Sequence, residues 1–197
     1  GLFSEILNQI DKKFKIKSNF FWVDERCVDP SSTDSNFGSA NKHFFSKVNI
    51  SNNNIFRIRG EEKPEIEASN YTKLLKTKTD IIKNIPSLDL CLLGIGGDGH
   101  TASIFPHELK KLSDKTDCVV GINPESEQKR VSLSIKQINN SKEVIFHVCG
   151  SGKKDVVDMV ISKRDNYLDL PASHILPKSK NLSWYLDFDS AETFMGT

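Results

Sequence analysis

The chain has 197 residues, of which 37% are hydrophobic and 27% are charged, values ordinary for a globular protein that argue against a disordered chain or a membrane protein. Its 27 Lys and Arg residues nearly balance 26 Asp and Glu residues, so no overall field is available to hold a nucleic acid or an anionic membrane. The length fits one substantial hydrophobic core, and we predict a single domain over residues 1–197.

The four cysteines lie far apart in the sequence and include no CxxC pair. Zinc sites and disulfide frameworks are therefore not predicted. The sequence also shows no signal-peptide pattern and no long apolar span, so the expected compartment is the cytosol.

Hydrophobic periodicity predicts both helices and strands in the first half of the chain. An aromatic and β-branched run at residues 20–23 is typical of a buried strand, and it stops at a charged loop, residues 24–26. Apolar residues recur at close to helical spacing from 61 to 85, which predicts a long amphipathic helix. The other expected elements are an amphipathic helix over 2–14, a loop over 29–39, a short helix over 40–45 and a short strand over 55–58.

The second half of the chain alternates strands with helices. Residues 88–95 form a nearly continuous apolar run, which is typical of a central parallel strand covered on both faces. His147 and Cys149 lie in another apolar run and are expected to be buried. This alternation predicts a doubly wound, Rossmann-like α/β fold with a mostly parallel sheet flanked by helices, in which ligands bind at the carboxyl ends of the strands. Further strands are predicted over 131–135, 144–149 and 182–186, and a helix over 155–161.

Three of the predicted strands end in polar residues that could carry chemistry. The strand at 20–23 runs into Asp24, Glu25 and Arg26, the one at 88–95 runs into a glycine-rich segment, and the one at 144–149 runs into residues 150–154, GSGKK. Because the carboxyl ends of parallel strands lie on one rim of a sheet, we expect these segments to converge there.

The glycine-rich segment at residues 94–100 reads GIGGDGH. Glycines allow positive φ angles and a close backbone approach, which leaves N–H groups for phosphate oxygens or a developing oxyanion. Alone, such a loop is equally compatible with nucleotide binding or with a simple turn that has no function. Asp98 and His100 sharpen the interpretation, because a histidine titrates near neutrality and can take a proton from water and return it within one turnover.

Residues 89–106, DLCLLGIGGDGHTASIFP, resemble the signature of the 6-phosphogluconolactonase family, which reads approximately D-L-x-L-L-G-x-G-x-D-G-H-T-A-S-L-F-P. Three further family blocks follow the same order along the chain. W-x-D-E-R-x-V and S-N-x-G match residues 22–38, R-x-T-L-T is approximated at 130–134, and G-x-x-K matches 150–153. Together these blocks are spread in the family's order over most of the chain.

This resemblance implies hydrolysis of a phosphorylated sugar lactone, 6-phospho-D-glucono-1,5-lactone, in the oxidative pentose phosphate pathway, without a metal or an organic cofactor. It implies that His100 is the general base, that Asp98 positions it, and that Arg26 and Lys153 hold the phosphate group. Glu25 is expected to pair with Arg26 or Arg130 rather than to act as an acid. The remaining residues expected to bind substrate or to shape its pocket are Ser35, Asn36, Gly96, Gly97, Gly99 and Arg130.

The beginning of the sequence departs from the family pattern. The family normally starts with a strand and a glycine-rich turn, about S-G-G-S-T-P, before a helix like the one expected at 2–14. The predicted fold therefore lacks its N-terminal strand, either because the sequence covers only part of the protein or because one wall of the pocket is lost. Two further possibilities are that the chain is part of a longer polypeptide and that it is fused to or associates with glucose-6-phosphate dehydrogenase.

Two other functions compete with lactone hydrolysis. Glucosamine-6-phosphate deaminases or isomerases share the fold and a G-I-G-x-x-G-H loop, but they continue with I-A-F-N-E-P where this chain has TASIFP at 101–106. The missing Asn–Glu pair argues against deamination. A non-catalytic sugar-phosphate-binding domain is the second alternative, and the presence of both Asp98 and His100 argues against it.

Overall fold

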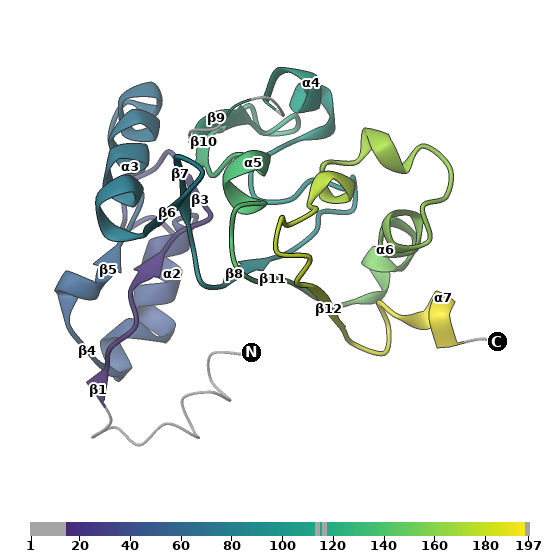
Figure 1. The fold of residues 1–197 in the computed structure, drawn as a ribbon, viewed down its shortest axis with the longest axis horizontal. Coiled ribbons are helices and arrows are strands. Elements are labelled where there is room, and N and C mark those ends of the chain that lie inside the picture. Colours follow the sequence, from purple (N-terminus) through teal and green to yellow (C-terminus); the bar gives the residue numbers. More distant parts are fainter. Residues whose placement is uncertain (1–14, 113–114, 116–117, 196–197) are drawn as a thin grey trace.

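The structure is a computed structural model that describes residues 15–112, 115 and 118–195 (Figure 1). The helix predicted over residues 2–14 lies outside the described residues. The strands are β1 Lys15–Ile16, β2 Phe20–Phe21, β3 Asp24–Arg26, β4 Asn49–Ile50, β5 Ile55–Phe56, β6 Asp80–Ile82, β7 Ile85–Ser87, β8 Cys91–Leu93, β9 Val119–Ile122, β10 Lys129–Ser132, β11 Val144–Val148 and β12 Leu182–Leu186. The helices are α2 Asn36–His43, α3 Pro64–Lys78, α4 Leu109–Leu112, α5 Ile135–Ile138, α6 Lys154–Ile161 and α7 Glu192–Met195.

A three-stranded parallel sheet, in the order β12–β11–β8, supports the C-terminal half of the described chain. Parallel neighbours need crossover connections, and the chain between β11 and β12 contains α6, while the chain between β8 and β11 contains α4 and α5. This arrangement confirms the predicted α/β, Rossmann-like class. The strand predicted at 182–186 is confirmed as β12, and the helix predicted at 155–161 is confirmed as α6.

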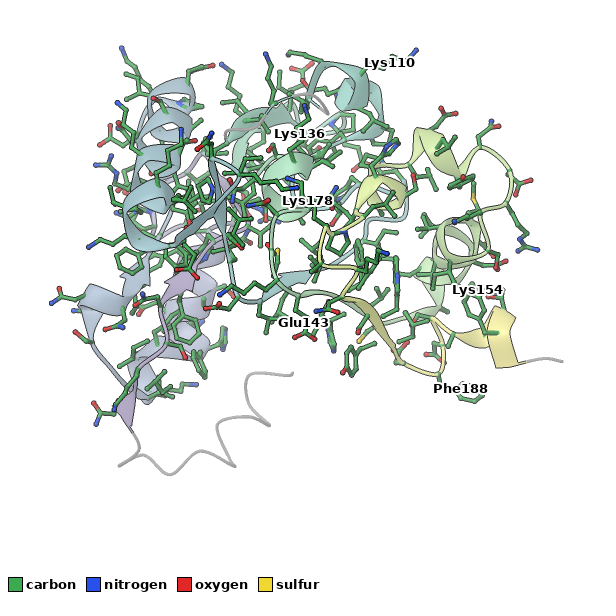
Figure 2. The ribbon with its side chains drawn as sticks, in the orientation of Figure 1. Lys110, Lys136, Glu143, Lys154, Lys178 and Phe188 are labelled. Carbon is green, nitrogen blue, oxygen red and sulfur yellow. The ribbon has the colours of Figure 1, made fainter. Side chains whose placement is uncertain are left out.

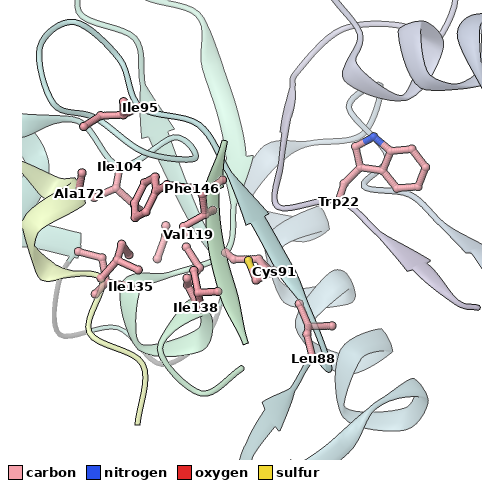
Figure 3. Close-up of a cluster of buried hydrophobic side chains, with 14 of the residues drawn as sticks. Trp22, Leu88, Cys91, Ile95, Ile104, Val119, Ile135, Ile138, Phe146 and Ala172 are labelled. Atoms are coloured by element: carbon pink, nitrogen blue, oxygen red, sulfur yellow. The ribbon is translucent and has the colours of Figure 1, made fainter. Parts of the chain in front are cut away.

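The main hydrophobic core lies against one side of this sheet (Figure 3). Ile104, Ile138 and Phe146 are fully buried there, and the Phe146 ring stacks on Trp184 with centroids 4.1 Å apart. A second group of aromatic side chains surrounds Trp22, whose ring lies 5.6 Å from that of Phe45. The sheet is thus held by packed apolar side chains, and its strand ends are free to carry polar groups.

The charged segment Asp24–Arg26 is itself a strand, β3, so the loop predicted there is wrong. It pairs antiparallel with β10, which in turn pairs antiparallel with β9. The register places Arg26 opposite Arg130 and Asp24 opposite Ser132. Hydrophobic patterning could not predict this strand, because its pairing depends on backbone hydrogen bonds to a partner about 100 residues away.

The helix predicted over 61–85 is shorter in the structure. α3 ends at Lys78, and the chain then forms an antiparallel hairpin of β6 and β7. Lys83 and Asn84 adopt positive φ angles of 52° and 64° in the turn, a conformation that asparagine tolerates better than most residues. Pro86 follows, and proline has no N–H to continue a helix.

Two other boundaries are set by serine caps. The Ser35 hydroxyl accepts the N–H of Gly38 and starts α2 at Asn36, rather than at residue 40 as predicted. The Ser134 hydroxyl accepts the N–H of Gln137, so the strand predicted over 131–135 ends at Ser132 and α5 follows. Serine is a favoured cap because its oxygen satisfies an otherwise unpaired N–H of the first helical turn.

An open slot separates β2 from β8. It has a volume of about 880 Å³ and is lined by residues 17–21 on one side and 87–92 on the other. The side chains of Leu90 and Leu92 are 47% and 54% exposed, so the prediction of a strand covered on both faces is wrong for β8. β8 pairs with β11 alone among the described strands, and a doubly covered parallel sheet would bury such leucines.

The C-terminal segment is attached by polar contacts. The Lys154 ammonium of α6 lies 2.8 Å from the Glu192 carboxylate of α7, while Phe188 points away from the body of the protein (Figure 2). Within the described residues, every helix falls short of the length and apolar content that crossing a bilayer requires.

Replacing Tyr71 with Phe is expected to lower the free energy of unfolding by about 1–3 kcal/mol, because it removes the partner of a buried backbone group. The buried Tyr71 hydroxyl accepts the N–H of Trp22 at 2.8 Å and lies 3.1 Å from the carbonyl oxygens of Trp22 and Phe56. Urea unfolding measures the change. Tyr185→Phe is the control, since Tyr185 is exposed, and an equal loss in both variants would contradict the role of this hydrogen bond.

Candidate active site

A cavity of about 320 Å³ opens where several strand ends meet. β3 and β10 border it from the antiparallel sheet, the glycine-rich loop after β8 forms its floor, and the 3₁₀ turn Ser151–Lys153 follows β11. The structure therefore brings together the three polar segments singled out in the sequence. The charged and polar side chains in its lining are those of Asp24, Arg26, Asn36, His100, Arg130 and Lys153.

Backbone hydrogen bonds fix the glycine-rich loop. The N–H of Gly96 donates to the carbonyl of His100 at 2.8 Å, and the N–H of Gly99 donates to the carbonyl of Gly96 at 3.0 Å. The Thr101 hydroxyl donates to the carbonyl of Gly94 at 2.8 Å, which closes the loop at its base. Gly99 has a φ of 81°, a conformation that favours glycine, and the loop folds back to direct His100 towards the cavity.

The Asp98 carboxylate holds the His100 ring. Its Oδ1 lies 2.6 Å from His100 Nδ1 and also accepts the backbone N–H of His100 at 3.1 Å. Burial alone would raise the pKa of Asp98, but the hydrogen bonds from His100 outweigh it and the pKa is lowered. An ionised Asp98 places the imidazole proton on Nδ1, which leaves the lone pair on Nε2 available as a base.

One buried ring supports both the imidazole and an arginine. Phe105 is fully buried, its ring lies 4.9 Å from the His100 ring, and the Arg130 guanidinium carbon lies 5.7 Å from its centroid. A guanidinium or an imidazole packs favourably against an aromatic face. These two polar side chains of the cavity lining therefore pack on one apolar ring that lies outside the lining.

Two arginines lie side by side at the cavity wall. Arg26 and Arg130 are paired in the β3–β10 register, and burial together with the charge of Arg26 lowers the pKa of Arg130. Arg26 Nη1 donates to the carbonyl of Asp34 at 2.7 Å, but the buried Nε atoms of both arginines have no hydrogen-bond partner among the described residues. Lys153 adds a third positive charge to the cavity lining, and a wall of this charge suits an anion.

Asn36 lies in the cavity lining as predicted, but Ser35 does not. Asn36 Nδ2 donates to the carbonyl of Asp24 at 3.0 Å, while Ser35 is buried and caps α2. Asp24 is a lining residue that we did not predict, and its Oδ2 accepts the hydroxyl proton of Ser103 at 2.7 Å. Its signal in the sequence is the D of the W-x-D-E-R block.

The prediction that Glu25 pairs with Arg26 or Arg130 is wrong. Its carboxylate accepts the backbone N–H groups of Arg26, Asn36 and Phe37 rather than a guanidinium. The Glu25 carboxylate faces the N-terminus of α2, where the first backbone N–H groups have no partner within the helix. If Glu25 paired with an arginine instead, these N–H groups would lack an acceptor.

The three glycines expected at the site have different surroundings. Gly96 lines the cavity, and a methyl group on its Cα would lie 2.1 Å from His100 Nδ1. Gly97 and Gly99 are outside the lining. A methyl group on Gly97 would lie 4.0 Å from Lys153 Nζ, whereas one on Gly99 would lie 2.7 Å from Leu170 Cδ2. Gly99 therefore has a packing role, and Gly96 makes room for the histidine.

The described residues contain no group of three or more His, Cys, Asp or Glu side chains that could hold a metal ion. The polar lining is instead dominated by cations and one imidazole. These groups suit an anionic substrate and proton transfer.

Several known proteins are similar to this chain in sequence or in fold. A 6-phosphogluconolactonase from Treponema pallidum (strain Nichols) is 39% identical over 160 residues, which is 81% of this chain and 66% of that protein. The human GDH/6PGL endoplasmic bifunctional protein is 32% identical over 88% of this chain and 22% of its own length. The crystal structure of a devB protein superposes with a TM-score of 0.90 at 36% identity, covering 98% of this chain and 81% of that one.

The family model for glucosamine-6-phosphate isomerases and 6-phosphogluconolactonase matches residues 2–184. That range contains every residue of the cavity lining. The chain therefore belongs to the glucosamine-6-phosphate isomerase/6-phosphogluconolactonase family.

Proposed function

We propose that this protein hydrolyses 6-phospho-D-glucono-1,5-lactone to 6-phospho-D-gluconate, a step of the oxidative pentose phosphate pathway. One observation carries the proposal: an imidazole held by Asp98 at 2.6 Å lies in the same cavity as Arg26, Arg130 and Lys153. A base and a cluster of cations are the two things that hydrolysis of a phosphorylated lactone requires.

In the proposed mechanism, His100 Nε2 takes a proton from water, and the resulting hydroxide adds to the lactone carbonyl carbon. The tetrahedral intermediate then collapses, the bond to the ring oxygen breaks, and the imidazolium returns its proton to that oxygen. The Asp98 carboxylate stabilises the imidazolium while it exists and keeps the ring in one orientation. No covalent intermediate and no cofactor enter this scheme.

We propose that the phosphate group binds at the part of the cavity wall formed by Arg26 and Arg130. Arg26 and Arg130 lie opposite each other in the β3–β10 register and their like charges repel, so an anion bound beside their guanidinium groups would relieve that repulsion. Lys153 contributes a point charge from the turn after β11. Asn36 and Asp24 offer an amide and a carboxylate to the hydroxyl groups of the sugar.

The residues after His100 disfavour the deaminase alternative. Where the deaminases carry an Asn–Glu pair, this chain has Ile104 and Phe105, and both are fully buried in the core. No carboxylate can therefore reach the imidazole from that segment. The geometry of the cavity favours lactone hydrolysis.

The wider setting is also part of the proposal. A glucose-6-phosphate dehydrogenase would supply the lactone, either as a separate enzyme or as a fused domain. One human relative is named a GDH/6PGL bifunctional protein. We place the reaction in the cytosol and the activity in a single domain.

The proposal is tested by adding the protein to freshly generated 6-phosphogluconolactone and following acid release. Hydrolysis well above the spontaneous rate is expected, with no activity on glucosamine 6-phosphate. Turnover of glucosamine 6-phosphate, or lactone loss at the spontaneous rate, would contradict the proposal.

Arg26→Ala is expected to raise KM about 10- to 100-fold with a smaller change in kcat, because a hydrogen bond to a charged group contributes about 1.5–3 kcal/mol. Steady-state kinetics separate the two constants. Arg57→Ala serves as the control, since Arg57 pairs with Glu61 outside the cavity lining and should leave KM unchanged. A pure kcat effect of Arg26→Ala would show that Arg26 does not bind the phosphate.

A further inference from the structure

Glu25 is a charged residue buried in β3, directly between two residues of the cavity lining. It is 2% exposed, and its neighbours Asp24 and Arg26 both face the cavity. Burying a carboxylate is costly unless its oxygens are satisfied by donors. The proposed mechanism leaves this residue without a role.

Four donors converge on the Glu25 carboxylate. Oε1 accepts the N–H groups of Arg26 at 2.8 Å and Asn36 at 2.7 Å. Oε2 accepts the N–H of Phe37 at 2.7 Å and the hydroxyl of Ser35 at 3.1 Å. Two of these N–H groups belong to the first turn of α2, where the helix dipole favours a negative charge. The carboxylate thus fastens the start of α2 to β3.

The same contacts join two residues of the cavity lining. Asn36 is held by its backbone N–H to Glu25 and by its side chain to the carbonyl of Asp24. Arg26 is held by its backbone N–H to Glu25 and by its guanidinium to the carbonyl of Asp34. Glu25 therefore fixes the strand and the turn at residues 34–37 to each other through both of these lining residues.

We infer that Glu25 is a positioning residue, which sets the substrate-binding geometry of Asn36 and Arg26 without touching the substrate. This inference rests on the proposed function for the identity of the substrate. It predicts that loss of the Glu25 contacts weakens substrate binding while the imidazole, which is held separately by Asp98, continues to work.

The test is Glu25→Gln. Glutamine keeps the size of the side chain, but its NH₂ group would meet backbone N–H donors where a carboxylate oxygen accepted them. The variant is expected to raise KM about tenfold, the size of one lost hydrogen bond, because Asn36 and Arg26 lose the contact that positions them. We expect kcat to stay within about threefold of the parent. Circular dichroism and thermal unfolding check that it remains folded.

Glu67→Gln is the matched control, because Glu67 is also a carboxylate 2% exposed. Glu67 lies in α3 and accepts hydrogen bonds from the backbone N–H and the guanidinium of Arg59. Neither Glu67 nor Arg59 lines the cavity. We expect Glu67→Gln to lower the unfolding temperature without changing KM. If the two variants change KM alike, or if Glu25→Gln changes unfolding alone, the positioning role is wrong.

A double-mutant cycle with Asn36→Ala tests the route of the effect. If Glu25 acts partly through Asn36, the increase in KM caused by Glu25→Gln must be smaller in the Asn36→Ala background. The same cycle is run with Arg26→Ala. If the effects of Glu25→Gln on KM are fully additive in both the Asn36→Ala and the Arg26→Ala backgrounds, the inference is overturned.

Calorimetric titration with 6-phosphogluconate separates this inference from the proposed function. A parent protein that binds 6-phosphogluconate without hydrolysing the lactone would contradict the function, while weaker binding by Glu25→Gln would still support positioning. A parent protein that neither binds nor hydrolyses would overturn both.

Discussion

Replacement of His100 with Gln is expected to lower kcat for lactone hydrolysis about 10²- to 10⁴-fold, the usual contribution of a general acid–base group. The imidazole is held in the cavity by Asp98, and its Nε2 is the base of the proposed mechanism. Glutamine retains a polar side chain of similar reach but cannot take a proton at neutral pH. KM should change much less than kcat, because the cations proposed to hold the phosphate are untouched.

The measurement is a pH-stat or dye assay on freshly prepared lactone, corrected for spontaneous hydrolysis, with circular dichroism to check the fold. His107→Gln is the matched control, since His107 is an exposed histidine of the same segment that lies outside the cavity lining. A normal kcat for the His100 variant would remove the general base from the mechanism.

Gly96→Ala is expected to lower kcat about 10²-fold, although it adds only one methyl group. That methyl would lie 2.1 Å from Nδ1 and 2.3 Å from Cε1 of His100, and 2.6 Å from Oδ1 of Asp98. The ring and the carboxylate must therefore both move, and a displacement of about 1 Å at a reacting group is enough for a loss of this size.

Gly152→Ala is the control for this variant, because a methyl group at Gly152 would have no atom within 4 Å and Gly152 does not line the cavity. It should remain close to the parent in kcat. A fully active Gly96→Ala protein would mean that the Asp98–His100 pair is not needed in the orientation seen here.

The sequence predicted the glycine-rich loop and its histidine well, because a short segment carries its own conformation. Asp98 and His100 are two residues apart, and their hydrogen bond depends on the loop between them. The strand at 182–186 was also predictable, since its apolar run has clear boundaries.

Burial within a strand was harder to predict. In β11, Val144, Phe146 and Val148 are buried, but His147 is exposed, and so is Cys149 beyond the strand end. An uninterrupted apolar run suggests two covered faces, whereas the described chain covers one face of this strand more completely than the other. The prediction that both residues are buried is therefore wrong.

Long-range pairing explains the remaining misses. Glu25 was expected to pair with an arginine, yet it is buried because α2 presents N–H groups to it from 11 and 12 residues away. Asp24 enters the site because β10 aligns with β3 and Ser103 reaches across to its carboxylate. No local pattern contains these partners.

The Phe105 ring is shared by His100 and Arg130, and this has a consequence for how the site could change. The proposed base and one of the cations proposed to bind the phosphate rest on the same buried ring, so they cannot be adjusted independently. A substitution that moves this ring to admit a bulkier phosphate ester would also tilt the imidazole. Substrate preference and turnover are thus mechanically linked, and new specificities are more readily obtained at Asn36 or Lys153, which do not rest on Phe105.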